Sequence, residues 1–318
     1  MRVVRSGPAR TVALAVVQAV AVAIAVVVVT FALVHIVPGD PARQALGPEA
    51  PQQTVDALRH QLGLDRPLPT QFVDFVGDAV QGDLGESITF SGRSVLGIVA
   101  SGLGVTLVLI AATVILSTLL GVPLGLIAAT SRRPSIDRSI RLTTIALLAT
   151  PPFFVGIVLI LLLAVNAGIA PAGGWGDGYP DNLRYLWMPT LALSCYLTPV
   201  IARVTRQRAR AILAEQFIDA AISRGLSLPR LTLRHVLPNS ALPVIALIGL
   251  NAGALIGGAV VVEAVFGLPG LGSVLVRAVS GRDYPVIQGT AIVAGVVVVC
   301  ANMLAEAAGR LIDPRTRA

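Results

Sequence analysis

Residues 103–129 read LGVTLVLIAATVILSTLLGVPLGLIAA, a stretch without a single charged side chain. About 20 apolar residues are enough for a helix to cross the hydrocarbon core of a bilayer, and this stretch exceeds that length. Inside the bilayer the backbone must satisfy its hydrogen bonds within the segment, which favours an α-helix. The stretch therefore predicts a transmembrane helix.

Further stretches are comparably apolar and have no charge in their cores. They comprise residues 11–34, 140–165, 186–202, 240–262 and 286–305. Over the whole chain, hydrophobic residues make up 55% and charged residues 13%, whereas a soluble domain carries about 25% charged residues. The sequence thus excludes a soluble globular protein and predicts an all-α, polytopic membrane protein with six transmembrane helices.

The arginines indicate how these helices are oriented. All 24 basic residues are arginine, and 17 of them lie before the first stretch, after the second (with Arg141 at the very start of the third), after the fourth or after the last. Because arginine-rich short loops stay on the cytoplasmic side, both termini are predicted to be cytoplasmic. Arg203, Arg206 and Arg210 share a helix face by their spacing, and they would contact either lipid headgroups or an acidic partner surface. Aromatic residues are only 4%, which argues against a nucleic-acid partner.

The chain lacks the residues that catalysis or ion coupling would require. The cores of the six stretches contain no ionisable side chain, whereas ion-coupled carriers need such groups near mid-bilayer. The three histidines lie at or outside the ends of the stretches, which argues against an intramembrane hydrolase. The absence of lysine excludes a Walker-type phosphate loop, and the two cysteines give no metal-ligand spacing. We therefore predict no catalytic residue and no metal site, and we expect the energy source to lie on another chain.

Small residues recur at helical spacing in the fifth predicted span. Gly249, Gly253 and Gly257 are four residues apart, which allows close approach of another helix. That helix could belong to the same subunit or to a partner, or the surface could slide during gating. Asn251 lies inside this run, where it would make an interhelical hydrogen bond or contact the substrate. These four residues are candidates for helix packing or for the translocation path.

The segment EQFIDAAISRG, residues 215–225, lies between the fourth and fifth predicted spans. It predicts a short helix from Glu215 to Arg224, with Gly225 as the left-handed residue that ends it. Ser227 is placed to cap a second short helix, and Pro229 fits its first turn. The apolar side chains of the first helix are Phe217, Ile218, Ala221 and Ile222. They form a face that could rest on lipid or dock onto a soluble protein.

The run Asp219-Ala220-Ala221, followed by Gly225 and Leu237-Pro238, resembles the EAA loop of ABC-importer permeases, with Asp219 where the family has Glu. In that family the loop forms a coupling helix that docks on the ATPase subunit. The resemblance implies the same role for residues 211–238 here. The candidate coupling residues are Glu215, Phe217, Ile218, Asp219, Ala220, Ala221, Arg224, Gly225, Leu237 and Pro238.

Other motifs occur along the chain in the same order as in one subfamily of these permeases. They are VPGDP at 37–41, LGLDRP at 62–67, GDLGES at 82–87, RHVLPN at 234–239, FGLPGLG at 266–272 and RDYP at 282–285. Together they resemble the B-type permease of dipeptide, oligopeptide and nickel importers. The resemblance implies a type I importer permease fold in the bacterial inner membrane. It divides the chain into residues 1–95, a helix with an extracytoplasmic loop region, and residues 96–318, the core permease domain.

The same resemblance implies partners and a substrate class. A B-type permease works with a C-type permease, two ATPase subunits or one fused ATPase, and an extracytoplasmic solute-binding protein. ATP and Mg²⁺ would then bind to the ATPases, and this chain would hold no cofactor. We expect it to translocate di- or oligopeptides by alternating access, with nickel or another small solute as the alternative.

Overall fold

The computed structural model describes residues 17, 20–21, 24–32, 41–47, 49–61, 63–90 and 92–312. Regular structure in this part of the chain is helical, apart from one isolated antiparallel bridge between Glu86 and Ser94. The all-α prediction is therefore confirmed. The chain divides into two compact units, Met1–Val105 with Pro269–Cys300 and Thr106–Leu268 with Ala301–Ala318.

The first unit combines the N-terminal region with a later helical segment. Its complete helices are α2 (Pro41–Leu46), α3 (Gln52–Gln61), α4 (Leu68–Val80) and α13 (Leu271–Ser280). It also contains the beginning of α5 (Val95–Thr130) and most of α14 (Tyr284–Ile312). Its core forms where Val95 and Val99 of α5 pack against Val274 of α13 and Val286 of α14. Of the predicted first span, residues 24–32 are helical, and much of the remainder lies outside the described residues.

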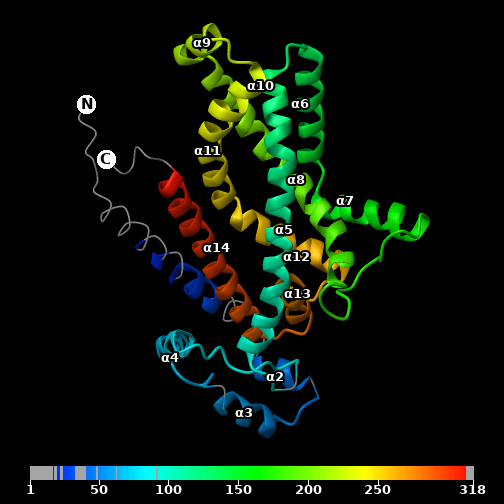
Figure 1. Ribbon diagram of the computed structural model, residues 1–318. Coiled ribbons are helices and arrows are strands. Elements are labelled where there is room, and N and C mark those ends of the chain that lie inside the picture. Colours follow the sequence, from blue (N-terminus) through cyan, green and yellow to red (C-terminus); the bar gives the residue numbers. More distant parts are fainter. Residues whose placement is uncertain are drawn as a thin grey trace. The chain divides into compact units, whose positions relative to one another are not determined.

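The second unit is built around the long helix α8 (Asn182–Leu213). The helices that pack against α8 include α6 (Pro134–Ala149), α7 (Pro152–Leu159), α11 (Leu237–Leu250) and α12 (Ala252–Phe266) (Figure 1). Shorter elements are the π-helix η1 (Ile160–Asn166), α9 (Gln216–Ser223), α10 (Leu228–Leu231) and the π-helix η2 (Thr232–Val236). Buried residues of α8, such as Leu193, Leu197 and Ile201, supply much of this unit's interior.

Glycines allow α5 and α8 to pack closely. A Cβ atom added at Gly121 would lie 2.9 Å from the carbonyl oxygen of Thr198, and one at Gly125 would lie 2.6 Å from that of Ala202. Both distances are too short for a real side chain, so only glycine permits this approach. Close backbone contact through small residues is a common way to join helices in a membrane.

The structure corrects the predicted third span. Residues 140–165 do not form one helix, because α6 ends at Ala149 and α7 begins at Pro152, and the chain bends by 94° between them (Figure 1). The cause is the pair Pro151-Pro152. A proline removes a backbone donor and disfavours helical geometry in the residue before it, here Thr150, which is extended.

The predicted fifth span is also corrected. Residues 240–262 do not form one helix. Their first part belongs to a helix that begins at Leu228 and ends at Leu250, and after an interruption at Asn251 their second part belongs to α12. Figure 1 shows the chain changing direction between α11 and α12. In the described part of the chain, four helices are long and apolar enough to cross a membrane. The number becomes six if α6 with α7–η1, and α12 with α13, each count as one span.

Candidate functional site

The short helix α9 carries half of the candidate coupling residues, and it ends as its sequence predicts. Glu215 precedes it in an extended conformation, and Gly225 follows it with a φ of +83°. The amide of Gly225 donates to the carbonyl of Ile222 at 2.8 Å, and the amide of Leu226 donates to that of Ala221 at 3.2 Å. This is the Schellman pattern, in which a left-handed glycine closes a helix.

One face of α9 is anchored on the chain's own helices. Ile218 is 1% exposed and packs with Ala209 of α8, Leu231 of α10 and Val236 of η2. Ala221 packs against the same cluster. At the border between the anchored and the open face, the half-exposed ring of Phe217 lies 6.2 Å from that of His235, between ring centroids, in an edge-to-face arrangement. A movement of α9 would therefore be passed to α8 and to the helix that begins at Leu228.

The other face of α9 is open. Phe217 is 47% exposed and Ile222 is 54% exposed, although both are large apolar residues. The polar or small candidates Glu215, Asp219, Ala220 and Arg224 are exposed as well. The apolar face predicted from the sequence is thus divided, with Ile218 and Ala221 turned towards the protein and Phe217 and Ile222 available to a partner.

The second helix differs from its prediction. Ser227 occupies the N-cap position and Pro229 lies in the first turn, but the Ser227 hydroxyl makes no capping hydrogen bond. The helix is not short, because α10, η2 and α11 follow one another without a break from Leu228 to Leu250. Leu237 and Pro238 accordingly form the first turn of α11 within that helix.

A carboxylate that the sequence reasoning missed joins α6 to α8. Asp137 accepts hydrogen bonds from Arg206 Nε at 2.6 Å, Arg206 Nη2 at 2.8 Å and Arg210 Nη2 at 3.1 Å, and Arg141 Nε lies 3.7 Å away. Asp137 precedes the apolar stretch that begins at residue 140. The hydrogen bond from Arg206 holds the pKa of this carboxyl below its ordinary value of 3.8.

This cluster corrects the interpretation of the α8 arginines. Arg206 and Arg210 bind an acid of the same chain, whereas the sequence had suggested lipid headgroups or an acidic partner. Arg203 is exposed. Asp137 is the one carboxylate in the arginine-rich segment 132–141. A single acid among several arginines is the sequence feature that could have indicated an ion-pair partner for the arginines of α8.

Asn251 and the nearby glycines do not form one continuous stripe. Asn251 sits at the interruption between α11 and α12, so Gly249 belongs to α11, whereas Gly253 and Gly257 belong to α12. The Tyr196 hydroxyl of α8 donates to Asn251 Oδ1 at 3.0 Å, which is an interhelical hydrogen bond. A Cβ at Gly249 would collide with Ala305, whereas one at Gly257 would meet open space.

Two buried carboxylates were also missed from the sequence. Glu263 is fully buried and accepts a hydrogen bond from the Thr106 hydroxyl at 2.6 Å. Asp283 is fully buried and accepts from the Ser87 hydroxyl at 2.5 Å and from the Thr89 amide at 2.9 Å. Ser87 and Asp283 belong to the GDLGES and RDYP motifs, so this contact joins two motifs that are far apart in the sequence. No group of three or more metal-ligating side chains occurs within the described ranges.

Comparison with known proteins identifies the family. The family described as "Binding-protein-dependent transport system inner membrane component" matches residues 121–318. Its N-terminal companion, "Binding-prot-dependent transport system membrane comp, N-term", matches residues 9–99.

Relatives match along nearly the whole chain. The glutathione transport system permease protein GsiC of Escherichia coli K12 is 37% identical over 290 residues, covering 91% of this chain and 93% of GsiC. The "Probable peptide ABC transporter permease protein" y4tP of Sinorhizobium fredii is 35% identical over 304 residues, covering 95% of this chain and 97% of that protein.

A solved structure supports the fold. A chain of the MetNI methionine ABC transporter, in an inward-facing conformation, superimposes with a TM-score of 0.59 at 16% identity. The match covers 69% of this chain and 97% of that one. Together with the family matches, it confirms the importer-permease fold. The chain belongs to the binding-protein-dependent transport system inner membrane component family, whose members are the multi-pass, non-catalytic permease subunits of ABC importers.

Proposed function

We propose that this permease imports di- or oligopeptides. The observation that carries this proposal is the identity of 35–37% to relatives named as peptide and glutathione permeases, over more than nine tenths of the chain. Glutathione is itself a tripeptide, so both names describe the same substrate chemistry. Nickel or another small solute is the alternative.

The assembly that fits this activity contains several chains. It comprises this B-type subunit, a homologous C-type permease, two ATPase subunits or one fused ATPase, and an extracytoplasmic solute-binding protein. ATP and Mg²⁺ bind on the ATPase chains, since this chain has no lysine for a Walker-type loop and needs no cofactor of its own. The binding protein delivers the solute, and alternating access moves it into the cytoplasm.

Coupling between ATP use and transport runs through α9. Phe217, Asp219 and Ile222 present an exposed surface of mixed apolar and acidic character to the ATPase. Ile218 holds the opposite face on α8 and η2. A rigid shift of α9 is thereby transmitted to two membrane-long helices. Asn251 acts as a packing residue in this scheme, because Tyr196 already engages its side-chain oxygen.

Reconstitution of the complete assembly tests the substrate. The complex, purified from cells that co-express the neighbouring subunits, is placed in vesicles, and uptake of labelled dipeptides, oligopeptides, glutathione and Ni²⁺ is measured with and without ATP and the binding protein. We expect peptide uptake that requires both. Uptake of Ni²⁺ without peptide uptake would contradict the substrate assignment, and ATP-independent uptake by the isolated chain would contradict the assembly.

A further inference from the structure

Helix α4 has an apolar side that its own chain covers only in part. The apolar residues follow helical spacing and lie within about half of the helix circumference. They are Leu68, Phe72, Val73, Phe75, Val76, Ala79 and Val80. Asp74 and Asp78 lie on the opposite side. None of the residues of α4, all of which the structure describes, is buried, and Leu68, Val73 and Val80 are 54%, 65% and 83% exposed.

The covered part of this apolar side rests on the first predicted span. The rings of Phe72 and Phe75 lie 5.2 Å and 5.9 Å from that of Phe31, measured between ring centroids. Phe31 belongs to the helical residues 24–32. Val28 lies three residues before Phe31, on the same side of that helix, and is 44% exposed. The apolar side of α4 thus continues the exposed apolar surface of the first span.

The helix that contains Phe31 packs against α14. The carbonyl oxygen of Thr30 accepts a hydrogen bond from Gln288 Nε2 at 3.3 Å. A Cβ atom added at Gly295 would lie 3.0 Å from Val26, so the later residue of α14 meets the earlier residue of the first span. The two helices therefore run antiparallel, as two spans that cross the bilayer in opposite directions should.

This packing sets the level of Phe31 in the membrane. Phe31 lies three residues before the end of the predicted span 11–34, and Gln288 lies two residues after the start of the predicted span 286–305. With a rise of about 1.5 Å per residue, both lie within about 5 Å of the span ends that are predicted to be external. Two spans thus independently place the contact with α4 at the external boundary of the hydrocarbon core.

The segment that follows α4 is attached at the same ends of the membrane helices. The Ser87 hydroxyl and the Thr89 amide donate to Asp283, which directly precedes α14. Leu84 packs against a core that includes Val286 of α14. Helix α4 is therefore held between the end of the first span and the beginning of α14.

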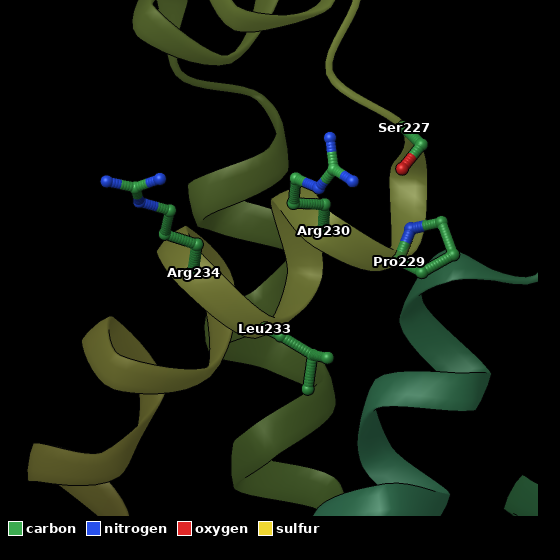
Figure 2. A pocket seen from close by; sticks show the side chains of 5 residues that line it. All are labelled: Ser227, Pro229, Arg230, Leu233 and Arg234. Carbon is green, nitrogen blue, oxygen red and sulfur yellow. The ribbon is translucent and has the colours of Figure 1, made fainter.

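The apolar side of α4 carries no charge, unlike the segment proposed to dock on the ATPase. Beside the turn that follows α9, an open hollow of about 450 Å³ is lined by Ser227, Pro229, Arg230, Leu233 and Arg234 (Figure 2). Such a mixture of apolar and polar groups is typical of a protein–protein contact. Acyl chains offer no partner for a charged group, and the uncharged side of α4 fits them.

We propose that α4 lies in the external interface of the bilayer, with Leu68, Val73 and Val80 against acyl chains and with Asp74 and Asp78 towards the water. An amphipathic helix in this position buries its apolar face about 5–10 Å into the boundary between headgroups and acyl chains. Figure 1 shows α4 almost end-on and α14 along its length, so α4 crosses the direction of that membrane helix. The proposal does not depend on which solute is imported.

Fluorescence quenching in lipid nanodiscs tests this position. In a complex from which the other cysteines have been removed, an environment-sensitive fluorophore is attached to Val73→Cys or Val80→Cys. The matched controls are Thr70→Cys and Asp78→Cys, which are exposed on the polar side of the same helix. The quenchers are iodide in the water and phospholipids with a nitroxide either near the headgroup or near the end of the acyl chain. We expect the nitroxide near the headgroup to quench most strongly at positions 73 and 80, and iodide to quench mainly at positions 70 and 78.

Three results would overturn the proposal. Equal quenching by iodide at all four positions, without quenching by lipid, would place the apolar side in water. Stronger quenching by the nitroxide near the chain end would place α4 in the hydrocarbon core rather than in the interface. Protection of positions 73 and 80 from iodide only after the solute-binding protein is added would make this side a protein contact. Size-exclusion profiles and retained ATPase subunits verify that each labelled complex is folded.

Discussion

Gly225 illustrates how one residue sets the position of a functional helix. Its φ of +83° lies in the left-handed region, and a Cβ added there would meet no atom within 4 Å. Glycine is therefore required by the backbone conformation at this position, and not because neighbouring atoms leave no room for a side chain. A side chain that tolerates positive φ should be accepted, and a β-branched one should not.

We predict that Gly225→Val uncouples the permease, whereas Gly225→Asn retains most of its function. Valine would strain the turn by about 1–2 kcal/mol and redirect the chain between α9 and Leu228, while asparagine enters the left-handed region readily. Transport in vesicles and retention of the ATPase subunits in pull-downs measure the effect, with membrane levels as the folding check. The external change Glu49→Val should matter little. Normal transport by Gly225→Val would contradict the role given to this turn.

The turn at Gly225 could be predicted from the sequence, but the contacts of α9 could not. A glycine that follows an amphipathic run predicts a helix end from the local sequence alone, because many helices end at a glycine in the left-handed conformation. The inward position of Ala221 depends on Ala209 and Val236, and no local pattern specifies such partners. A charge at Ala221 would therefore disturb packing, and the exposed Phe217 is the better position for testing the surface that we propose to contact the ATPase.

At the scale of helices, Asp137 connects α6 to α8 close to the arginine-rich end of α8. The side chains of Asp137 and Arg206 are 13% and 18% exposed, so their hydrogen-bonded pair is partly shielded from solvent. Ala209, which supports α9, lies between Arg206 and Arg210 on the same helix. Fixing this end of α8 to α6 therefore also fixes part of the platform beneath α9.

We predict that Asp137→Asn lowers the stability of the complex by about 1.5–3 kcal/mol, the range for a hydrogen bond to a charged group. The thermal unfolding midpoint measures this. Because the pKa of Asp137 is lowered, its contribution is fully present above the ordinary value of 3.8 and is lost only as the pH falls through the lowered pKa. The difference from the wild type should thus be constant between pH 8 and pH 5.

The matched control is Asp74→Asn, which breaks the exposed pair with Arg66. Pairs of this kind contribute about 0–1 kcal/mol, so the control should change the midpoint little. If Asp74→Asn lowered the unfolding midpoint as much as Asp137→Asn, the partly shielded Asp137 cluster would contribute no more stability than an exposed ion pair, and the prediction would be wrong.

The existence of the helices was predictable from uncharged length, whereas their interruptions were harder to foresee. Pro151-Pro152 gave a usable signal inside an apolar run, because consecutive prolines rarely continue a helix. The break at Asn251 gave a weaker signal, because Gly249, Asn251 and Gly253 have low helix propensity but are tolerated within membrane helices. It coincides with the hydrogen bond from Tyr196, a partner 55 positions away. The interruption at Asn251 thus combines low local helix propensity with a packing contact that the local sequence does not reveal.

At the scale of the whole molecule, two contacts agree with the predicted topology. Asp137, with Arg206 and Arg210, joins the loop after the second predicted span to the segment after the fourth, and both were assigned to the cytoplasm. Ser87 and Asp283 join two loops that were assigned to the opposite side. Each contact joins two segments that are predicted to lie on the same side of the membrane. The contacts support this topology independently, because the arginine count uses no distances.

Cysteine labelling should therefore place Glu49 outside and Ser223 inside. In a background with Cys195→Ala and Cys300→Ala, a membrane-impermeant maleimide should label Glu49→Cys in intact spheroplasts and label Ser223→Cys only after permeabilisation. Both positions are exposed, so access to the reagent depends on the membrane rather than on burial. The physical basis is that 17 of the 24 arginines lie on the side of Ser223. Labelling of both cysteines in intact spheroplasts would contradict the topology, and it would also place the surface of α9 out of reach of a cytoplasmic ATPase.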